Sequence, residues 1–439
     1  MAFVNSSKIL EILSAYNPFW ISGTIDAGIP RDLLPACSAQ IQSKEVLVLK
    51  GIRRSGKSTL MNQIIQELIK TGIPPAAILR VNLEEPLFAP EYSITLLEDI
   101  YRTYRERVYP EGKCWVFLDE VQQVTGWESW VRGRQDTEDI KFFVTGSSAS
   151  ILSREIGTKL TGRNVTFEVF PLSFIEYLRF HNLHIRSELD YITKKTAIRN
   201  FFSEYLMYGG FPEVTLKKTD TEKKILLKSY FDDILYRDII SRYQIRDVTS
   251  LRNLAVYLLT QIARPTNISK LKNNFTISQD KTESYISALL ESYLLFKISG
   301  FSYSLKQSMR SGFKPYAIDT GLRNRVAFSF SEDTGWQVEN VIACFLRQRY
   351  EEVYFSKNGK ETDFIVKEGI HISRRIQVWY DDISVRKIPD REITGLTVPL
   401  HDDTNEASIL LTNDYEDVIE RDGIAIRCIP VVKYLLFSE

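Results

Sequence analysis

The chain has 439 residues, a length that predicts about three domains. Its residues are 44% hydrophobic and 26% charged, an ordinary composition for a soluble globular protein. Its 56 basic and 56 acidic residues cancel, which excludes an overall basic nucleic-acid binder, so any basic surface must be local. Four scattered cysteines without a C-x-x-C pair, and only four histidines, exclude a disulfide framework and a zinc cluster. No apolar run approaches the ~20 residues of a membrane span. The N-terminus lacks a signal-peptide pattern, so we expect a cytoplasmic protein.

The segment 51–59 reads GIRRSGKST and matches the phosphate-binding pattern G-x-x-x-x-G-K-S-T. It follows a short apolar run of buried-strand type at 45–50 and precedes helically spaced apolar residues at 60–69. Strand, loop and helix in this order are the context in which the pattern binds a nucleotide. We therefore predict a P-loop; the alternative is a chance glycine turn before a helix.

Each residue type in this loop has a chemical reason. Gly51 and Gly56 let backbone amides turn toward an anion, and the following helix adds its N-terminal dipole. Lys57 would reach the β and γ phosphates of ATP, and the Ser58 hydroxyl would bind Mg²⁺. The predicted nucleotide-binding residues of the loop are Gly51, Arg54, Ser55, Gly56, Lys57, Ser58 and Thr59.

The segment 113–120 reads KCWVFLDE, an apolar run that ends in two carboxylates, which is the Walker B pattern. A buried strand that ends in this way places both acids at the carboxyl edge of a parallel sheet, where ligands bind. Asp119 would hold Mg²⁺ through its water shell, and Glu120 would polarise the attacking water as a general base. The alternative is a strand that merely ends in acids.

Two more strand patterns follow, at 140–148 and at 165–172, and the second comes directly after the segment LTGR that ends at Arg163. An arginine in this place is a candidate arginine finger, which stabilises charge on the transferring phosphoryl group and can act across a subunit boundary. Arg154 is the competing candidate. Either residue could instead be a solvated loop charge.

These segments together resemble a known family. GIRRSGKST, VFLDE, FFVTGSS, LTGR and EVFPLSF, followed by YGGFPE and LYRD, are similar in order and spacing to a prokaryotic AAA-type ATPase family. That family is related to AAA+ and STAND-class signalling ATPases and carries a C-terminal region of unknown function. The resemblance runs roughly from Arg31 to the end of the chain. It implies a parallel α/β sheet, ATP and Mg²⁺ as cofactors, and ATP hydrolysis.

The resemblance also implies roles for single residues. Thr145 or Ser147, at the end of the strand 140–148, would be the sensor that orients the attacking water; a simple Gly-Ser turn is the alternative. Arg31, in a helical lead-in, would lie near adenine or else only pack on the sheet. The Gly-Gly-Phe-Pro turn would lead into a helical lid. Within this lid, Arg237 would either touch phosphate or form a salt bridge in the neighbourhood of Asp238.

Three short helical patterns and a hairpin between 248 and 328 predict a winged helix. Ile286, Leu289 and Leu290 would face its core. Residues expected to be exposed on the recognition helix are Lys281, Thr282, Ser284, Tyr285 and Ser287. Residues of the wing that could meet phosphates are Lys306, Arg310 and Lys314. The alternative is an interdomain packing module with a solvated basic face.

The last segment has the order of elements of a restriction-endonuclease-like fold, in which two acids hold Mg²⁺ and a lysine steadies the phosphate or water. Glu339 and Asp363 take the two acidic positions, but the third motif has Gln377 in place of an acid and Trp379 in place of the lysine. We therefore predict a nuclease-like domain that does not cut, unless a basic residue elsewhere, such as Lys360, substitutes.

The predicted architecture is an AAA+-like P-loop domain, a helical lid, a winged helix and a nuclease-like α/β domain, at residues 1–205, 206–247, 248–328 and 329–439. The predicted function is Mg²⁺-dependent ATP hydrolysis coupled to binding and remodelling or translocation of duplex or branched DNA. A homo-oligomer would do this, with a hexameric ring as one candidate. The alternatives are a STAND-type switch that acts on a protein partner and an ATP-regulated nuclease.

Overall fold

The computed structural model describes residues 5–148, 160, 162–302, 312–328, 334–356, 361–381, 388–397 and 407–438. The chain divides into two units. Unit 1 comprises residues 1–169 and 291–293, and unit 2 comprises residues 170–290 and 294–439. The first division falls at Val169, before the predicted boundary at 205, and the finer division into four domains stays a prediction. Within the described residues, no helix combines the length and the apolar character that crossing a lipid bilayer requires.

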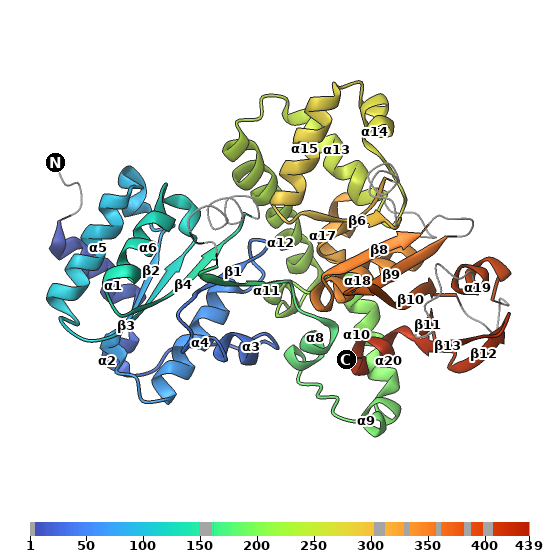
Figure 1. Ribbon diagram of the computed structural model, residues 1–439, viewed down its shortest axis with the longest axis horizontal. Helices are drawn as coiled ribbons and strands as arrows, with labels where there is room; N and C mark the ends of the chain where they lie inside the picture. Colours follow the sequence, from blue (N-terminus) through green and yellow to red (C-terminus); the bar gives the residue numbers. More distant parts are fainter. Residues whose placement is uncertain are drawn as a thin grey trace. The chain divides into compact units, whose positions relative to one another are not determined.

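Unit 1 is built on a parallel sheet with strand order β2-β3-β4-β1-β5 (Figure 1). Its strands are β1 (Val46–Lys50), β2 (Ile78–Asn82), β3 (Cys114–Asp119), β4 (Ile140–Gly146) and β5 (Asn164–Glu168). The central strands are buried on both faces, as expected for continuous apolar runs in a parallel sheet. The five strands and their α/β context confirm the predicted parallel sheet.

Helices cover both faces of this sheet. The helices of unit 1 are α1 (Ser6–Tyr16), α2 (Phe19–Ser22), α3 (Leu34–Ser38), α4 (Lys57–Lys70), α5 (Ile94–Arg107) and α6 (Trp127–Thr137), with 3₁₀ turns at η1 (Pro75–Ala77), η2 (Pro86–Glu91) and η3 (Val121–Gln123). Apolar side chains of α1, α5 and α6 form one buried cluster with the strands, and those of α2, α3 and α4 form the other. The sheet therefore lies between two apolar layers, and the ends of its strands remain for ligand binding.

Unit 2 contains a mixed sheet of eight strands with the order β12-β13-β11-β10-β9-β8-β6-β7. Its strands are β6 (Leu295–Gly300), β7 (Phe313–Ala317), β8 (Glu352–Ser356), β9 (Thr362–Glu368), β10 (His371–Trp379), β11 (Ala407–Thr412), β12 (Asp417–Arg421) and β13 (Ile424–Pro430). The β6–β7 hairpin was expected as the wing of a separate domain, but β6 pairs in parallel with β8. The hairpin therefore extends the sheet that carries the segment predicted to be nuclease-like.

The described helices of unit 2 are α8 (Phe174–Phe180), α9 (Glu188–Thr193), α10 (Lys195–Tyr208), α11 (Pro212–Thr215), α12 (Asp220–Asp233), α13 (Val248–Thr260), α14 (Ile268–Phe275), α15 (Gln279–Glu291), α17 (Thr320–Val326), α18 (Thr334–Arg349), α19 (Asp390–Thr397) and α20 (Val431–Phe437) (Figure 1). The LYRD motif lies in a π-helix, η4 (Ile234–Ser241), where Arg242 Nη2 lies 3.9 Å from Asp238 Oδ1 and Arg237 is exposed. The role of Arg237 at a phosphate stays a prediction.

The α15 helix does not present the face that the sequence predicted. Thr282 and Tyr285 are buried, as are Ile286 and Leu289, so the buried part of the helix surface is wider than predicted. Ser284 and Ser287 are exposed, as expected, and Lys281 is half-buried. The prediction of exposed Thr282 and Tyr285 was therefore wrong. Lys306 and Arg310 lie outside the described residues.

The Gly-Gly-Phe-Pro turn has a packing reason within unit 2. Gly209 has φ +72°, and a Cβ there would lie 2.1 Å from Asp319 Oδ1, while a Cβ on Gly321 would lie 2.0 Å from the Tyr208 carbonyl oxygen. Asp319 accepts hydrogen bonds from the backbone N–H of Gly210 (2.7 Å) and of Leu322 (2.8 Å). Burial raises the pKa of the Asp319 carboxyl to about 6, although these N–H donors lower it. Glycines are therefore required where two backbone segments meet at one carboxylate.

Candidate nucleotide-binding site and a second charged centre

The P-loop joins the carboxyl end of β1 to the start of α4, as the sequence predicted. Gly51 has φ +150°, and a Cβ there would lie 2.3 Å from the Val169 carbonyl oxygen. Gly56 has φ +97° directly before α4. Both positions exclude a side chain for steric or conformational reasons, which leaves the backbone amides of the loop accessible to an anion.

The polar side chains of the loop suit a triphosphate. Lys57 is buried, and its Nζ donates to the carbonyl oxygens of Gly51 (3.1 Å) and Ile52 (3.0 Å). The Ser55 hydroxyl is buried and has no hydrogen-bond partner in the described part of the chain. Ser58 is half-buried in the first turn of α4. An ammonium held on the loop and an unsatisfied hydroxyl beside it are what a phosphate group would engage, so these residues fit ATP with Mg²⁺.

The two Walker B acids lie at the same edge of the sheet. Asp119 ends β3, and the neighbouring β4 brings Thr145 level with it. The Thr145 hydroxyl donates to Asp119 Oδ1 (2.5 Å) and accepts from the backbone N–H of Glu120 (2.9 Å). Thr145 therefore fixes both acids at the end of β3, which is the place a sensor residue would occupy.

The Glu120 carboxylate is buried beside Lys57. Its backbone is left-handed at φ 59°, and its Oε1 lies 3.7 Å from Lys57 Nζ. Burial alone would raise the pKa of the Glu120 carboxyl, but the charges of Lys57 and Arg53 and hydrogen bonds from Gln122 and Ser147 hold it below its ordinary value. The carboxyl is therefore ionised at neutral pH, as a general base must be.

Three neighbours of this site were missed from the sequence. Gln122 Nε2 donates to Glu120 Oε2 and to the Ser147 hydroxyl, the latter at 3.2 Å. Arg80 Nη2 lies 3.4 Å from Asp119 Oδ2. Arg53 forms a two-bond pair with Glu84, at 2.7 and 3.1 Å. Sequence alone could not single them out, because Asp119, Glu84 and Ser147 lie 39, 31 and 25 residues from Arg80, Arg53 and Gln122 along the chain.

The predicted arginines fall in different places. Arg31 is buried, and its Nη1 donates to the Ser55 carbonyl oxygen (2.7 Å), so it braces the P-loop. Arg163 precedes β5 at the amino edge of the sheet, opposite the P-loop, and its half-exposed guanidinium pairs with Asp136 Oδ1 (2.5 Å). Arg54 is exposed, and Arg154 lies outside the described residues. Thr59 is exposed on α4.

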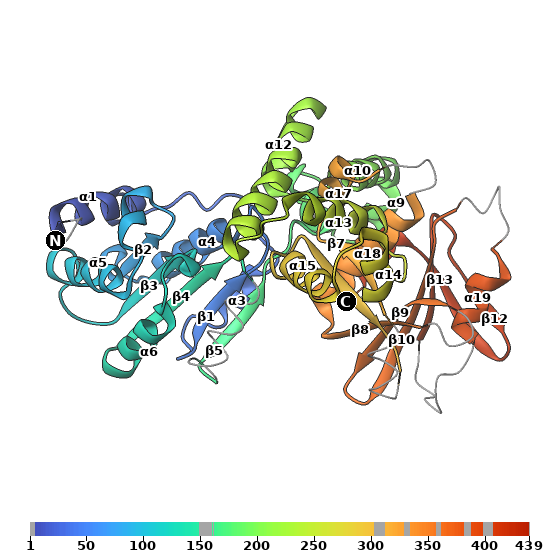
Figure 2. The same ribbon diagram turned by 90° about the horizontal axis from the view of Figure 1, so that it is seen from above.

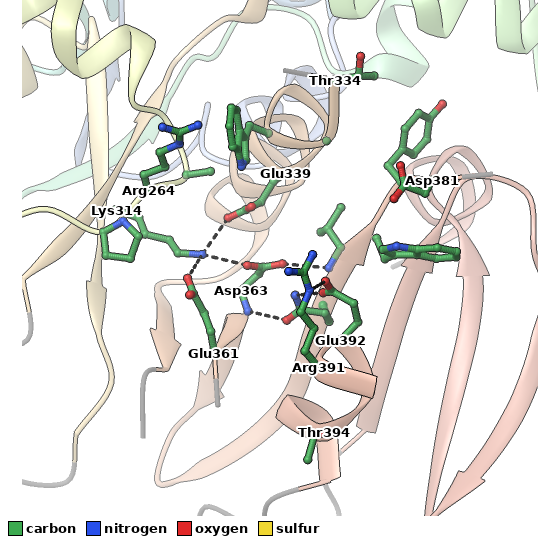
Figure 3. Close-up of a pocket in the computed structure, with 18 of the residues that line it drawn as sticks. Arg264, Lys314, Thr334, Glu339, Glu361, Asp363, Asp381, Arg391, Glu392 and Thr394 are labelled. Atoms are coloured by element: carbon green, nitrogen blue, oxygen red, sulfur yellow. Dashed lines mark hydrogen bonds and ion pairs between the residues drawn. The ribbon is translucent and has the colours of Figure 1, made fainter. Parts of the chain in front are cut away.

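A second charged centre lies in unit 2, in a cavity of about 1150 Å³ (Figure 3). Lys314 on β7 is 1% exposed, and its Nζ lies 2.9 Å from Asp363 Oδ1 and 3.1 Å from both Glu339 Oε1 and Glu361 Oε1. The Tyr316 hydroxyl also donates to Glu339 Oε1 (2.7 Å). The predicted role of Lys314 as an exposed wing residue was wrong, because three carboxylates hold it inside the sheet domain.

The two substituted positions of the nuclease-like motif serve other contacts. Gln377 Oε1 accepts from the Asp363 backbone N–H (3.1 Å), and its Nε2 donates to Glu392 Oε2 (2.8 Å). Trp379 is buried in an apolar cluster with Leu396 and Leu410. The cation beside Glu339 and Asp363 is therefore Lys314, which lies on β7 rather than on the strand of the third motif. Lys360 lies outside the described residues. Within the described ranges, no three His, Cys, Asp or Glu side chains are grouped to hold a metal ion.

The charges in this centre depend on one another. Burial alone would lower the pKa of the Lys314 ammonium, but the charges of Asp363, Glu339 and Glu361 raise it well above its ordinary value. Burial and the charge of Asp363 raise the pKa of the Glu339 carboxyl, although Lys314 and Tyr316 oppose this. Lys314 is therefore a permanent cation in an excess of acid.

Two family models match the chain. Residues 43–178 match an AAA domain, which includes the P-loop, Asp119, Glu120 and Thr145. Residues 199–333 match a domain of unknown function (DUF8612), which includes the predicted lid and winged helix. An AAA domain implies nucleotide binding, typically of ATP with Mg²⁺, at the site just described.

Solved structures resemble the chain only loosely. A STAND protein with a tetratricopeptide repeat sensor from Pyrococcus horikoshii is 13% identical, with a TM-score of 0.27 over 75% of this chain and 46% of that one. AMPPCP-bound DnaA from Aquifex aeolicus is 15% identical, with a TM-score of 0.25 over 63% of this chain and 92% of that one. Superpositions this loose support no argument about function.

Proteins of similar sequence cover most of the chain. An uncharacterized protein of Methanocaldococcus jannaschii is 31% identical over 385 residues, which are 84% of this chain and 82% of the relative. An uncharacterized protein of Haemophilus influenzae is 30% identical over 401 residues, which are 89% of this chain and 94% of the relative. The chain therefore belongs to the family of these archaeal and bacterial proteins, and it carries an AAA-type P-loop nucleotide-binding domain followed by the domain of unknown function.

Proposed function

We propose that this protein is a Mg²⁺-dependent ATPase that hydrolyses ATP to ADP and phosphate. The single observation that carries the proposal is the arrangement at the carboxyl edge of the sheet, where Thr145 fixes Asp119 and Glu120 and the Glu120 carboxylate lies 3.7 Å from Lys57. An AAA domain over the same residues supports it.

The chain's own residues divide the work. Lys57 leaves the loop carbonyls to bind the β and γ phosphates, while the loop amides and the start of α4 hold the rest of the triphosphate. Ser58 and Asp119 would hold Mg²⁺, which neutralises charge that develops on the phosphates. Glu120 takes a proton from the attacking water, and Thr145 with Ser147 keeps that water in line.

The arginine finger is the part that this chain does not complete by itself. Arg163 lies at the edge of the sheet opposite the P-loop, so it can reach a γ-phosphate only from a neighbouring subunit. Action in trans requires a homo-oligomer, and a ring, hexameric or otherwise, would present each Arg163 to the next site. Comparing the size of the protein with and without a non-hydrolysable ATP analogue tests assembly directly.

Mixing two inactive variants tests Arg163. Arg163→Ala alone should lose about 10³-fold in turnover, because a finger supplied in trans contributes 10³–10⁵. Lys57→Ala keeps Arg163 but cannot use ATP. Mixed subunits should recover ATPase activity, since the Lys57→Ala subunit lends its Arg163 to the intact P-loop of its neighbour. Arg163→Ala with the turnover of the parent protein would show that the finger is another residue.

ATP turnover is coupled to duplex or branched DNA that the C-terminal part of the chain binds. Stimulation of the ATPase by DNA at low salt, where phosphate contacts are strongest, tests this coupling, and its absence there would refute it. The alternative is a nucleotide-dependent switch that acts on a protein partner. Nucleotide that stays bound through purification, together with slow turnover, would favour the switch.

The centre around Lys314 does not cut DNA. Gln377 is engaged by the Asp363 backbone and by Glu392, Trp379 belongs to the core, and the acids that would hold a metal are ion-paired with the Lys314 ammonium. A nuclease would need those acids free for Mg²⁺. Mg²⁺-dependent nicking that disappears in Asp363→Ala would contradict this part of the proposal.

A further inference from the structure

A second cavity in unit 2, of about 570 Å³, is lined by basic and aromatic side chains rather than by a cluster of acids around one lysine. It is lined by residues of α12, α13 and α14 and by the end of α17, and these helices lie near one another in both views (Figures 1 and 2). Its volume is within the range of pockets that hold small organic ligands. Neither the nucleotide site nor the Lys314 centre uses any of these residues.

The residues that line the cavity include more cations than acids. Lys228, Arg252 and Arg325 come from three helices and are exposed. Within the described residues, none of the three has a carboxylate at ion-pair distance, and Asp232 is the one acid among the residues that line the cavity. On α15, by contrast, Lys281 lies 2.6 Å from Asp247 Oδ2 and is neutralised. In a chain without net charge, three cations and one acid at one cavity make a local surface that attracts anions.

Aromatic rings stand beside these cations. Phe328, at the rim, is 69% exposed. Tyr257 and Phe275 pack edge to face with their ring centroids 5.3 Å apart, and the Tyr257 hydroxyl accepts a hydrogen bond from Asn274 Nδ2 (3.2 Å). The Tyr257–Phe275 pair is thus held in place by its own contacts, whereas the exposed ring of Phe328 is accessible for stacking with a ligand. Exposed aromatic faces together with cations are how proteins bind unpaired bases and their phosphates.

We infer that this cavity binds a segment of single-stranded nucleic acid, with phosphates at Lys228, Arg252 and Arg325 and a base stacked on Phe328. A duplex would keep its bases paired and stacked on one another, so the ring would gain nothing from it. This inference rests on the DNA-coupling part of the proposed function and narrows it for this cavity to the unpaired strand that a branched DNA exposes, beside α12 and α13 rather than on α15.

The test measures binding without nucleotide, so its failure is independent of the ATPase. A labelled oligo-dT strand is titrated with the full-length protein by fluorescence anisotropy at several salt concentrations. The variant Arg252→Ala/Arg325→Ala should reduce the slope of log affinity against log salt by about 1.4, because each lost phosphate contact on a single strand removes about 0.7. Phe328→Ala should weaken binding roughly 5- to 150-fold, since a stacked base contributes about 1–3 kcal/mol.

The control removes two other exposed cations, Lys218 and Arg427, which do not line the cavity and have no ion pair within the described residues. Lys218→Ala/Arg427→Ala should bind oligo-dT like the parent protein. Because every substituted residue is exposed, circular dichroism should show unchanged folding. The inference is overturned by any of four results. These are no binding of oligo-dT, an equal loss of duplex binding in the cavity variants, an equal loss of oligo-dT binding in the control, or competition by thymidine monophosphate as strong as by the strand. The last result would mean that the ligand is a free nucleotide.

Discussion

Glu120→Gln should bind ATP like the parent protein but hydrolyse it about 10²- to 10⁴-fold more slowly, the usual contribution of a general base. Glutamine keeps the size of the side chain and the backbone N–H that Thr145 holds at 2.9 Å, so the site should keep its shape. The substitution removes the carboxylate that would accept the proton of the attacking water. Lys57 also loses a carboxylate 3.7 Å away, which leaves it free for phosphate.

The measurement is single-turnover hydrolysis beside equilibrium binding of ATP, because the two together separate chemistry from affinity. Glu85→Gln is the matched control. The Glu85 carboxylate accepts a hydrogen bond from the Tyr16 hydroxyl (2.9 Å), and it is half-buried in the same unit. The Glu85→Gln variant should hydrolyse ATP at the rate of the parent protein. Equal turnover in Glu120→Gln and the parent protein would remove Glu120 from the mechanism.

Lys314→Met should destabilise the protein by about 3–5 kcal/mol, the usual cost of removing one partner from a buried ion pair. Methionine fills most of the volume but leaves Asp363 and Glu339 buried without a cation. The Lys314 ammonium lowers the pKa of the Glu339 carboxyl, so without it that pKa rises further above its value in the unfolded chain. The folded variant then binds protons that the unfolded chain does not, so its stability should recover as pH falls toward ~4.

Urea unfolding at several pH values measures this effect. Lys367→Met is the matched control, because Lys367 pairs with Glu352 at 3.2 Å near the surface and should contribute at most ~1 kcal/mol. Lys314→Met/Asp363→Asn should regain part of the loss, since it removes one of the stranded charges. A Lys314→Met protein as stable as the parent at neutral pH would mean that the three carboxylates do not depend on this lysine.

The nucleotide site could be predicted because its signals are local. The P-loop is a contiguous segment, and Asp119 with Glu120 directly follows its strand, so each motif carries its own structural context. The roles of Gln122 and Arg80 could not be predicted, because each depends on which strand lies beside it. Strand order is decided by the packing of the whole sheet rather than by any segment.

The second centre shows the same limit more clearly. Trp379 in the lysine position predicted a site without its cation, yet Lys314 reaches Asp363 from a strand 49 residues earlier. The sequence pattern of a hairpin is the same whether the hairpin forms a free wing or joins a sheet, so Lys314 was predicted to lie in a wing where it could meet phosphates. The face of α15 was predicted wrongly for a related reason, because the buried Tyr285 donates its hydroxyl hydrogen to the carbonyl oxygen of Asp247 (3.2 Å), 38 residues earlier in the chain.

The most direct test of the account is calorimetric titration of the purified protein with ATP and Mg²⁺, beside Lys57→Ala and the control Lys70→Ala, whose surface lysine pairs with Glu67. We predict saturable binding to the parent protein and to Lys70→Ala. We predict a loss of roughly 10- to 150-fold in Lys57→Ala, since a hydrogen bond to a charged group contributes about 1.5–3 kcal/mol. No binding of ATP to the parent protein, or equal binding to all three, would contradict the account.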